Sequence, residues 1–202
     1  MSRANLALSL MIFFSSFLSV LFTARLELAI PIVKEPLSLN CLIKMLLCST
    51  FVFCFIMSLI VFVFIDDILK LFFSQESYGN WLLITPFYGL ILSISSIFMM
   101  VLTKEMNFHE MGLSLLLQNC AFCFLAVMLS YFSVSFNGLI VSKCVGLIAS
   151  VIFISMVIKY KIRELFFLNL EFRHIKKITR DLKKFIQFNF PISIMGVVGK
   201  DL

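Results

Sequence analysis

Charged side chains interrupt a long apolar stretch at FTARLELAIPIVKEP, residues 22–36, and they are the most conspicuous chemical groups in the sequence. Arg25 and Glu27 are two positions apart, so on a helix their side chains would point in different directions. Glu27 and Lys34 are seven positions apart and would share one stripe of a continued helix, which Pro31 is expected to kink. Ionisable groups within a membrane span are costly and by default indicate a substrate path. The competing interpretation is that Arg25 only marks the membrane interface and extends to lipid head groups, and both interpretations stay open from the sequence.

The remaining polar groups do not suggest an enzyme. Cys120 and Cys123 have C-x-x-C spacing, but neighbouring ligands, a helix-start context or a second pair would be needed for metal or redox chemistry. Cysteine in a packed or lipid-facing helix behaves as a small hydrophobic residue. His109 and His174 are far apart, and neither has a second ligand at metal-binding spacing. We therefore expect no catalytic residue, no cofactor and no metal site, and the cysteines do not imply disulfides.

The composition requires a lipid environment. Of the 202 residues, 61% are hydrophobic and 14% are charged, whereas a soluble domain has about 25% charged and about 45–50% apolar residues. Even a soluble domain of roughly 150 residues buries only about 70% of the surface that its unfolded chain exposes. The sequence therefore predicts an integral membrane protein.

The apolar runs are long enough to be membrane-spanning helices, since about 20 residues cross about 30 Å of hydrocarbon. The stretch from Met111 to Ile158 contains one charge, Lys143. As one helix it would measure about 72 Å at about 1.5 Å per residue, so it must fold back, and the polar stretch Ser130–Gly138 is where it can. A transmembrane barrel would instead show segments of roughly 10 residues with alternating polarity. The predicted spans are residues 4–24, 42–65, 80–103, 111–130 and 139–158.

The predicted fold is thus all-α, a polytopic transmembrane helix bundle with five complete spans and the start of a sixth. The bundle occupies residues 1–158. A basic amphipathic cytoplasmic linker follows at 159–184, and residues 185–202 begin a further span that is cut short. The linker has the pattern of a helix that lies against an anionic leaflet, so we expect no nucleic-acid partner.

The distribution of charge predicts the orientation. If the loops are numbered alternately, thirteen basic residues fall on the even side and three on the odd side. The basic side is expected to be cytoplasmic, which leaves the amino terminus outside. The even side holds Arg25, Lys34, Lys44, Lys104 and nine residues of 159–184, and the odd side holds Arg3, Lys70 and Lys143. A first span that begins outside, and an apolar run that stops at Leu202, lead us to expect a chain truncated at both ends.

The motif RLELAIPIVKEP, residues 25–36, resembles one family. Bacterial polysaccharide (Wzx-type) flippases of the multidrug/oligosaccharidyl-lipid/polysaccharide exporter superfamily carry R-Y-E-L-A-I-x-x-P-K after their second helix. The matching positions are Arg25, Glu27, Leu28, Ala29, Ile30 and Lys34. The chain departs from the pattern at Leu26, where the family often has tyrosine, and at Pro31, which lies earlier than the usual proline. Residues 82–108 resemble the family's fourth helix, and FIQFNFPISIMG, residues 185–196, resembles the beginning of its seventh.

The resemblance implies a multi-pass transporter of the bacterial inner (plasma) membrane. It would function in the biosynthesis of a polysaccharide such as the O-antigen of lipopolysaccharide. It would flip an undecaprenyl-pyrophosphate-linked oligosaccharide from the cytoplasmic to the outer leaflet, and this chain would hold helices two to six of about a dozen. The implied partners are the bilayer, the lipid-linked oligosaccharide and other polysaccharide-assembly membrane proteins. The candidate substrate path consists of Arg25, Glu27, Lys34, Lys104 and Lys143. Arg25, Lys34 and Lys104 would meet the head group at the cytoplasmic mouth, Lys143 would serve the exit, and Glu27 would pair with a cation or couple to protons or sodium.

Three other functions compete with the flippase, and the second of them fits poorly. A drug or metabolite exporter of the same superfamily would depend on acidic residues within its helices. A polysaccharide polymerase or another membrane glycosyltransferase would need a sizeable polar outer loop, and the candidates at 66–76 and 130–138 are short. A non-catalytic membrane scaffold is the third.

Overall fold

The computed structural model of the chain describes residues 3–72, 80–131, 137–159 and 163. Within this part every regular element is helical, as the sequence predicts. The elements are α1 (Arg3–Thr23), the short 3-10 helix η1 (Leu26–Ala29), α2 (Pro36–Phe72), α3 (Asn80–Lys104), α4 (Phe108–Tyr131) and α5 (Asn137–Val157). Except for Lys159 and Arg163, the predicted basic linker and the predicted truncated span at 185–202 lie outside the described residues.

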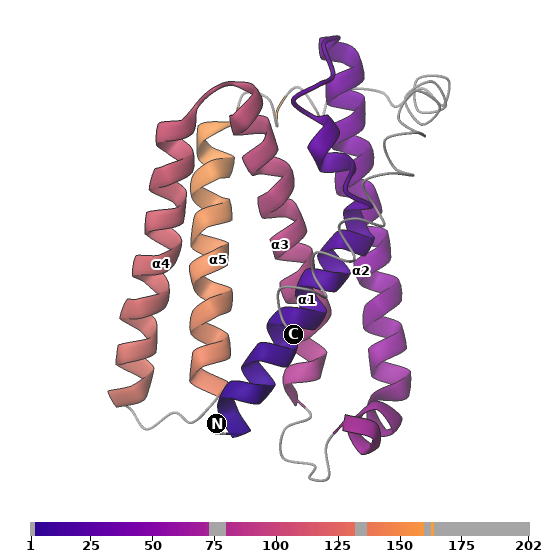
Figure 1. Cartoon of the computed structure of the whole chain (residues 1–202), viewed down its shortest axis with the longest axis vertical. Helices are drawn as coiled ribbons and strands as arrows, with labels where there is room; N and C mark the ends of the chain where they lie inside the picture. Colours follow the sequence, from indigo (N-terminus) through magenta and orange to yellow (C-terminus); the bar gives the residue numbers. More distant parts are fainter. Residues whose placement is uncertain (1–2, 73–79, 132–136, 160–162, 164–202) are drawn as a thin grey trace.

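Helix α3 is the central element of the bundle. It packs against α1, α2, α4, α5 and η1. Helices α4 and α5 form an antiparallel pair on one side of α3, while α2 lies on the other side and α1 crosses the bundle obliquely (Figure 1). The main apolar cluster joins the η1 segment to α2, α3 and α5, with Ile30, Leu42, Leu102 and Ile154 fully buried.

Four of the described helices are long and apolar enough to cross a membrane. They are α2 over Pro36–Ile65, α3 over Leu83–Lys104, α4 over its full length and α5 over Gly138–Val157. Helix α1 adds a shorter apolar segment, Met11–Thr23. Together these helices make the chain a multi-pass helical membrane protein.

The outer surfaces of α2 and α4 fit a lipid environment. Ser114 is the single buried residue of α4, and this helix exposes Phe124 and Val127. Helix α2 likewise exposes Phe55 and Phe62. Contiguous apolar patches of this extent are rare on soluble monomers, whereas lipid tails can cover them.

The long apolar run that contains Lys143 is divided into two helices. Helix α4 ends at Tyr131 and α5 begins at Asn137, so the chain reverses within the polar stretch where the sequence predicts a fold-back. The connection between α3 and α4 is a tighter reversal. The amides of Met106 and Asn107 donate to the carbonyls of Thr103 and Leu102 at 3.1 and 3.0 Å. With Met106 at φ 55°, this is a Schellman C-cap that lacks the usual glycine.

Helix α2 is longer than the predicted span 42–65. It begins at Pro36, whose fixed φ suits the first position of a helix, and the Leu39 amide donates to the Glu35 carbonyl at 3.0 Å. The helix continues to Phe72 through a kink at Phe64, where φ is −105°. The backbone of residues 66–72, which the sequence analysis assigned to an outer loop, is therefore helical. Helical propensity continues past the apolar boundary because Asp66, Asp67 and Lys70 do not themselves end a helix.

Candidate functional site

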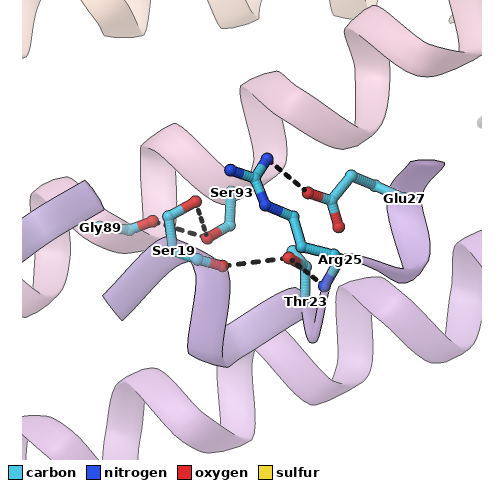
Figure 2. Close-up of polar contacts among 6 residues, drawn as sticks. All are labelled: Ser19, Thr23, Arg25, Glu27, Gly89 and Ser93. Atoms are coloured by element: carbon cyan, nitrogen blue, oxygen red, sulfur yellow. Dashed lines mark hydrogen bonds and ion pairs between the residues drawn. The ribbon is translucent and has the colours of Figure 1, made fainter. Parts of the chain in front are cut away.

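The charged motif begins at an abrupt end of α1. Ala24 and Arg25 both have left-handed backbone conformations, with φ of 47° and 58°. The Thr23 hydroxyl donates to the Ser19 carbonyl at 3.1 Å and accepts a hydrogen bond from the Arg25 amide at 3.3 Å (Figure 2). Two successive non-glycine residues in this region cost roughly 1–2 kcal/mol each. Such strain persists where surrounding contacts over-determine the conformation, as at functional sites.

This turn brings Arg25 and Glu27 together, which corrects the expectation that their side chains diverge. Arg25 Nη1 lies 3.5 Å from Glu27 Oε1, and the two charged groups point toward one another (Figure 2). The expectation assumed a continuous helix through the motif. Because the chain leaves α1 through a left-handed turn and enters η1, side chains two positions apart can meet. For the same reason, Glu27 and Lys34 do not share a helical stripe.

The carboxylate of this ion pair is buried in an apolar setting. Glu27 is 2% exposed and Arg25 is 30% exposed. The flanking residues Leu26, Ala29 and Ile30 belong to the main apolar cluster. Arg25 Nε and Glu27 Oε2 are buried and have no hydrogen-bond partner. The pair is therefore joined through one nitrogen and one oxygen, and each partner retains an unsatisfied polar atom.

Lys104 lies at the same end of the bundle and holds the motif in place. Its ammonium group donates to the Ile30 carbonyl at 3.3 Å and also to the Val33 carbonyl. These contacts join the last residue of α3 to the segment that follows η1. A cation at the carboxyl end of a helix also interacts favourably with the helix dipole. The sequence placed Lys104 on the substrate path, and the structure shows its charged end occupied by main-chain oxygens.

The other two lysines of the predicted path are in different settings. Lys34 is exposed in the same loop as Arg25 and Glu27. Lys143 is on α5, and its Nζ lies 4.6 Å from the centroid of the Phe122 ring on α4. It is about 21 Å along the helix from Val157, at about 1.5 Å per residue. The structure thus brings four of the five predicted residues to one end of the bundle and places Lys143 well away from them.

A polar interface between α1 and α3, which the sequence analysis did not single out, leads to the motif. Ser15, Ser19 and Thr23 follow one another at four-residue spacing, and all three are buried. The Ser93 hydroxyl hydrogen-bonds with the Ser19 hydroxyl at 3.0 Å and donates to the Gly89 carbonyl at 2.8 Å (Figure 2). Small residues at this spacing let membrane helices approach closely. The sequence signals that could have revealed the interface are S-x-x-x-S-x-x-x-T at 15–23 and T-x-x-x-G-x-x-x-S at 85–93.

The close approach is visible at Gly89. A Cβ atom there would lie 3.3 Å from both the Ser15 carbonyl oxygen and the Leu18 Cβ. The interface therefore fixes the end of α1, and with it the position of Arg25, against the central helix.

The arrangement can bind an anion through Arg25, or a cation or proton through Glu27. Within the described ranges, no three His, Cys, Asp or Glu side chains are grouped so that they could hold a metal ion. The six cysteines are free thiols. Comparison with family models, curated proteins and solved structures finds no match for this chain.

Proposed function

We propose that this chain is part of a polysaccharide-biosynthesis flippase of the bacterial inner membrane. Its cargo is an undecaprenyl-pyrophosphate-linked oligosaccharide, which moves from the cytoplasmic to the outer leaflet. On this proposal the four long apolar helices and the apolar part of α1 contribute to the membrane bundle of the transporter. The similarity of residues 25–36 to the flippase motif is the origin of the proposal.

The observation that carries the proposal is the Arg25–Glu27 pair, with its carboxylate buried, at the end of the apolar helix α1. Burial of an ionised carboxylate such as that of Glu27 is costly, and apolar side chains of similar volume are often at least as stable as a buried ion pair. Ionisable residues retained at such places usually mark a pathway for polar cargo. A pyrophosphate-linked sugar that crosses hydrocarbon needs positive charge and hydrogen-bond donors, and the partly exposed guanidinium group of Arg25 can supply both.

The test is replacement of Arg25 in cells that depend on this gene for surface polysaccharide. Arg25→Ala should reduce polysaccharide assembly at least ten-fold and cause the lipid-linked oligosaccharide to accumulate on the cytoplasmic side. This follows because loss of a charge-assisted contact to a phosphate costs about 1.5–3 kcal/mol, and about 1.4 kcal/mol is a factor of ten. Arg163→Ala, which removes an exposed arginine outside the motif, is the matched control. Normal assembly by Arg25→Ala at equal protein abundance would contradict the proposal.

A drug or metabolite exporter of the same superfamily is the second candidate, and the burial of Glu27 favours it. Efflux proteins of that kind depend on acidic groups within the membrane, and Glu27 is a buried carboxylate. Efflux of a cationic dye that is lost in Glu27→Gln, with unchanged polysaccharide assembly, would support the exporter and exclude the flippase.

A further inference from the structure

The ion pair between Arg25 and Glu27 is incomplete. A guanidinium group presents its Nε and Nη donors as a planar fork that matches the two oxygens of a carboxylate or phosphate. Here only Nη1 faces Glu27, at 3.5 Å, while Nε of Arg25 and Oε2 of Glu27 lack partners. In an apolar setting, each unpaired buried polar group is costly. The geometry is therefore suboptimal for a purely structural salt bridge.

The unpaired Nε donor is the atom that a tetrahedral oxyanion would use. Phosphate groups bind arginine through two parallel N–H···O bonds, which are stronger than a single charge-assisted contact. An oxyanion bound in this way would satisfy the donor that Glu27 leaves unpaired. It would also place a second negative charge beside Glu27, and like charges at such distances repel in a low-dielectric setting. Glu27 and an oxyanion thus compete for the same guanidinium group.

We propose that Glu27 is a built-in competitor of the anionic ligand of Arg25. In the empty state Glu27 neutralises Arg25, and a phosphate-type oxyanion takes over the guanidinium group through Nε and Nη when it binds. The inference rests on the proposed function in taking a pyrophosphate-linked lipid as the cargo. Its physical consequence is that Glu27 weakens ligand binding and keeps Arg25 neutralised while no cargo is present.

Binding of farnesyl pyrophosphate to the purified full chain in lipid nanodiscs tests this inference. Glu27→Gln keeps the shape of the side chain and removes its charge. This variant should bind farnesyl pyrophosphate roughly three- to ten-fold more tightly than the wild type, because one partly buried competing charge is removed. Arg25→Gln should bind at least ten-fold more weakly. The double variant Arg25→Gln/Glu27→Gln should bind as Arg25→Gln does, because Glu27 acts only through Arg25.

Two further ligands identify the source of the oxyanion. Inorganic pyrophosphate reports binding of the free anion, and farnesol reports binding of the lipid tail alone. Farnesyl pyrophosphate should bind most tightly and inorganic pyrophosphate more weakly. Neither Arg25→Gln nor Glu27→Gln should change the binding of farnesol. Thermal unfolding of every variant in the same nanodiscs establishes that it is folded.

Several outcomes would overturn the inference. One is unchanged or weaker binding in Glu27→Gln, which would make Glu27 a supporting residue. Another is an equal gain from Glu27→Gln with and without Arg25, which would reflect net charge alone. A third is that neither the wild type nor Glu27→Gln binds any pyrophosphate. Failure of the proposed function would give a different result. The variants would bind farnesyl pyrophosphate with the predicted differences in affinity, while cells that carry Arg25→Ala would assemble polysaccharide normally.

Discussion

At the scale of single residues, the candidate site depends on backbone conformation more than on sequence spacing. Ala24 and Arg25 adopt left-handed conformations, and that turn lets Arg25 and Glu27 meet. Lys104 then fixes the following residues through the carbonyls of Ile30 and Val33. The lysine is a positioning residue for the motif, since its charged end contacts main-chain oxygens of the loop.

Replacement of Lys104 should loosen the motif loop. Lys104→Met keeps the length of the side chain and removes both hydrogen bonds, so the loop should lose about 1–3 kcal/mol of local stability. Hydrogen exchange should accelerate at the amides of Ile30, Ile32 and Val33, which hydrogen-bond within this segment. Lys104→Arg should restore part of the protection because it retains a cationic donor. Identical exchange in Lys104→Met and the wild type would show that the loop holds its conformation without the lysine.

At the scale of helices, close approach at small residues sets the packing. The pair α4 and α5 meets at Gly146, where a Cβ atom would lie 2.7 Å from the Gln118 carbonyl oxygen and 3.3 Å from the Phe122 backbone nitrogen. Main-chain atoms cannot move aside as a flexible side chain can. The contact of these two helices therefore requires glycine at this position.

Gly146→Ala should destabilise the bundle by about 1–3 kcal/mol, the usual cost of overpacking. Gly112→Ala is the matched control, because nothing lies within 4 Å of a Cβ atom at that position of α4. The control should be neutral or stabilising by about 0.5–1 kcal/mol, since alanine favours a helix over glycine. Thermal unfolding in detergent measures both. Equal stability of Gly146→Ala and the wild type would mean that α4 and α5 are not packed as described.

At the scale of the whole molecule, the apolar exterior and the charge distribution define how the chain lies in a membrane. The loop that carries Lys34 and the turn after α3 are at one end of the bundle, as the bond from Lys104 to Val33 requires (Figure 1). The end of α4 at Tyr131 is at the opposite end. The excess of basic residues on the even loops predicts that the end with Lys34 faces the cytoplasm.

Labelling of single cysteines tests this arrangement. In a variant with all six native cysteines replaced, Lys34→Cys and Met106→Cys should react with an impermeant maleimide only when the cytoplasmic face is accessible. Tyr131→Cys should react from the opposite side of the membrane, because Tyr131 is 85% exposed at the other end. Labelling after detergent treatment is the control for reactivity. Labels on Lys34→Cys and Met106→Cys from opposite sides would rule out the bundle.

The sequence alone determined the environment and the helical class of this protein. Long runs without charge require lipid, and in lipid a helix satisfies its own backbone hydrogen bonds within one segment. That requirement is local, so the helical class and the break near Ser130–Gly138 could be predicted from composition and run length. The continuation of α2 beyond its apolar run could not, because the helix boundary and the membrane boundary are set by different forces.

Only the tertiary structure decided how the charged residues meet. The contacts of Lys104 join residues 71 and 74 positions apart, and the close approach of α1 to α3 depends on two separate rows of small residues. Arg25 and Glu27 are only two positions apart, but their contact still depends on tertiary packing. The two side chains meet across a left-handed turn that local propensity disfavours. Packing of η1 into the apolar cluster stabilises that turn. Sequence spacing predicts contacts on a regular helix, and at this site the backbone is not a regular helix.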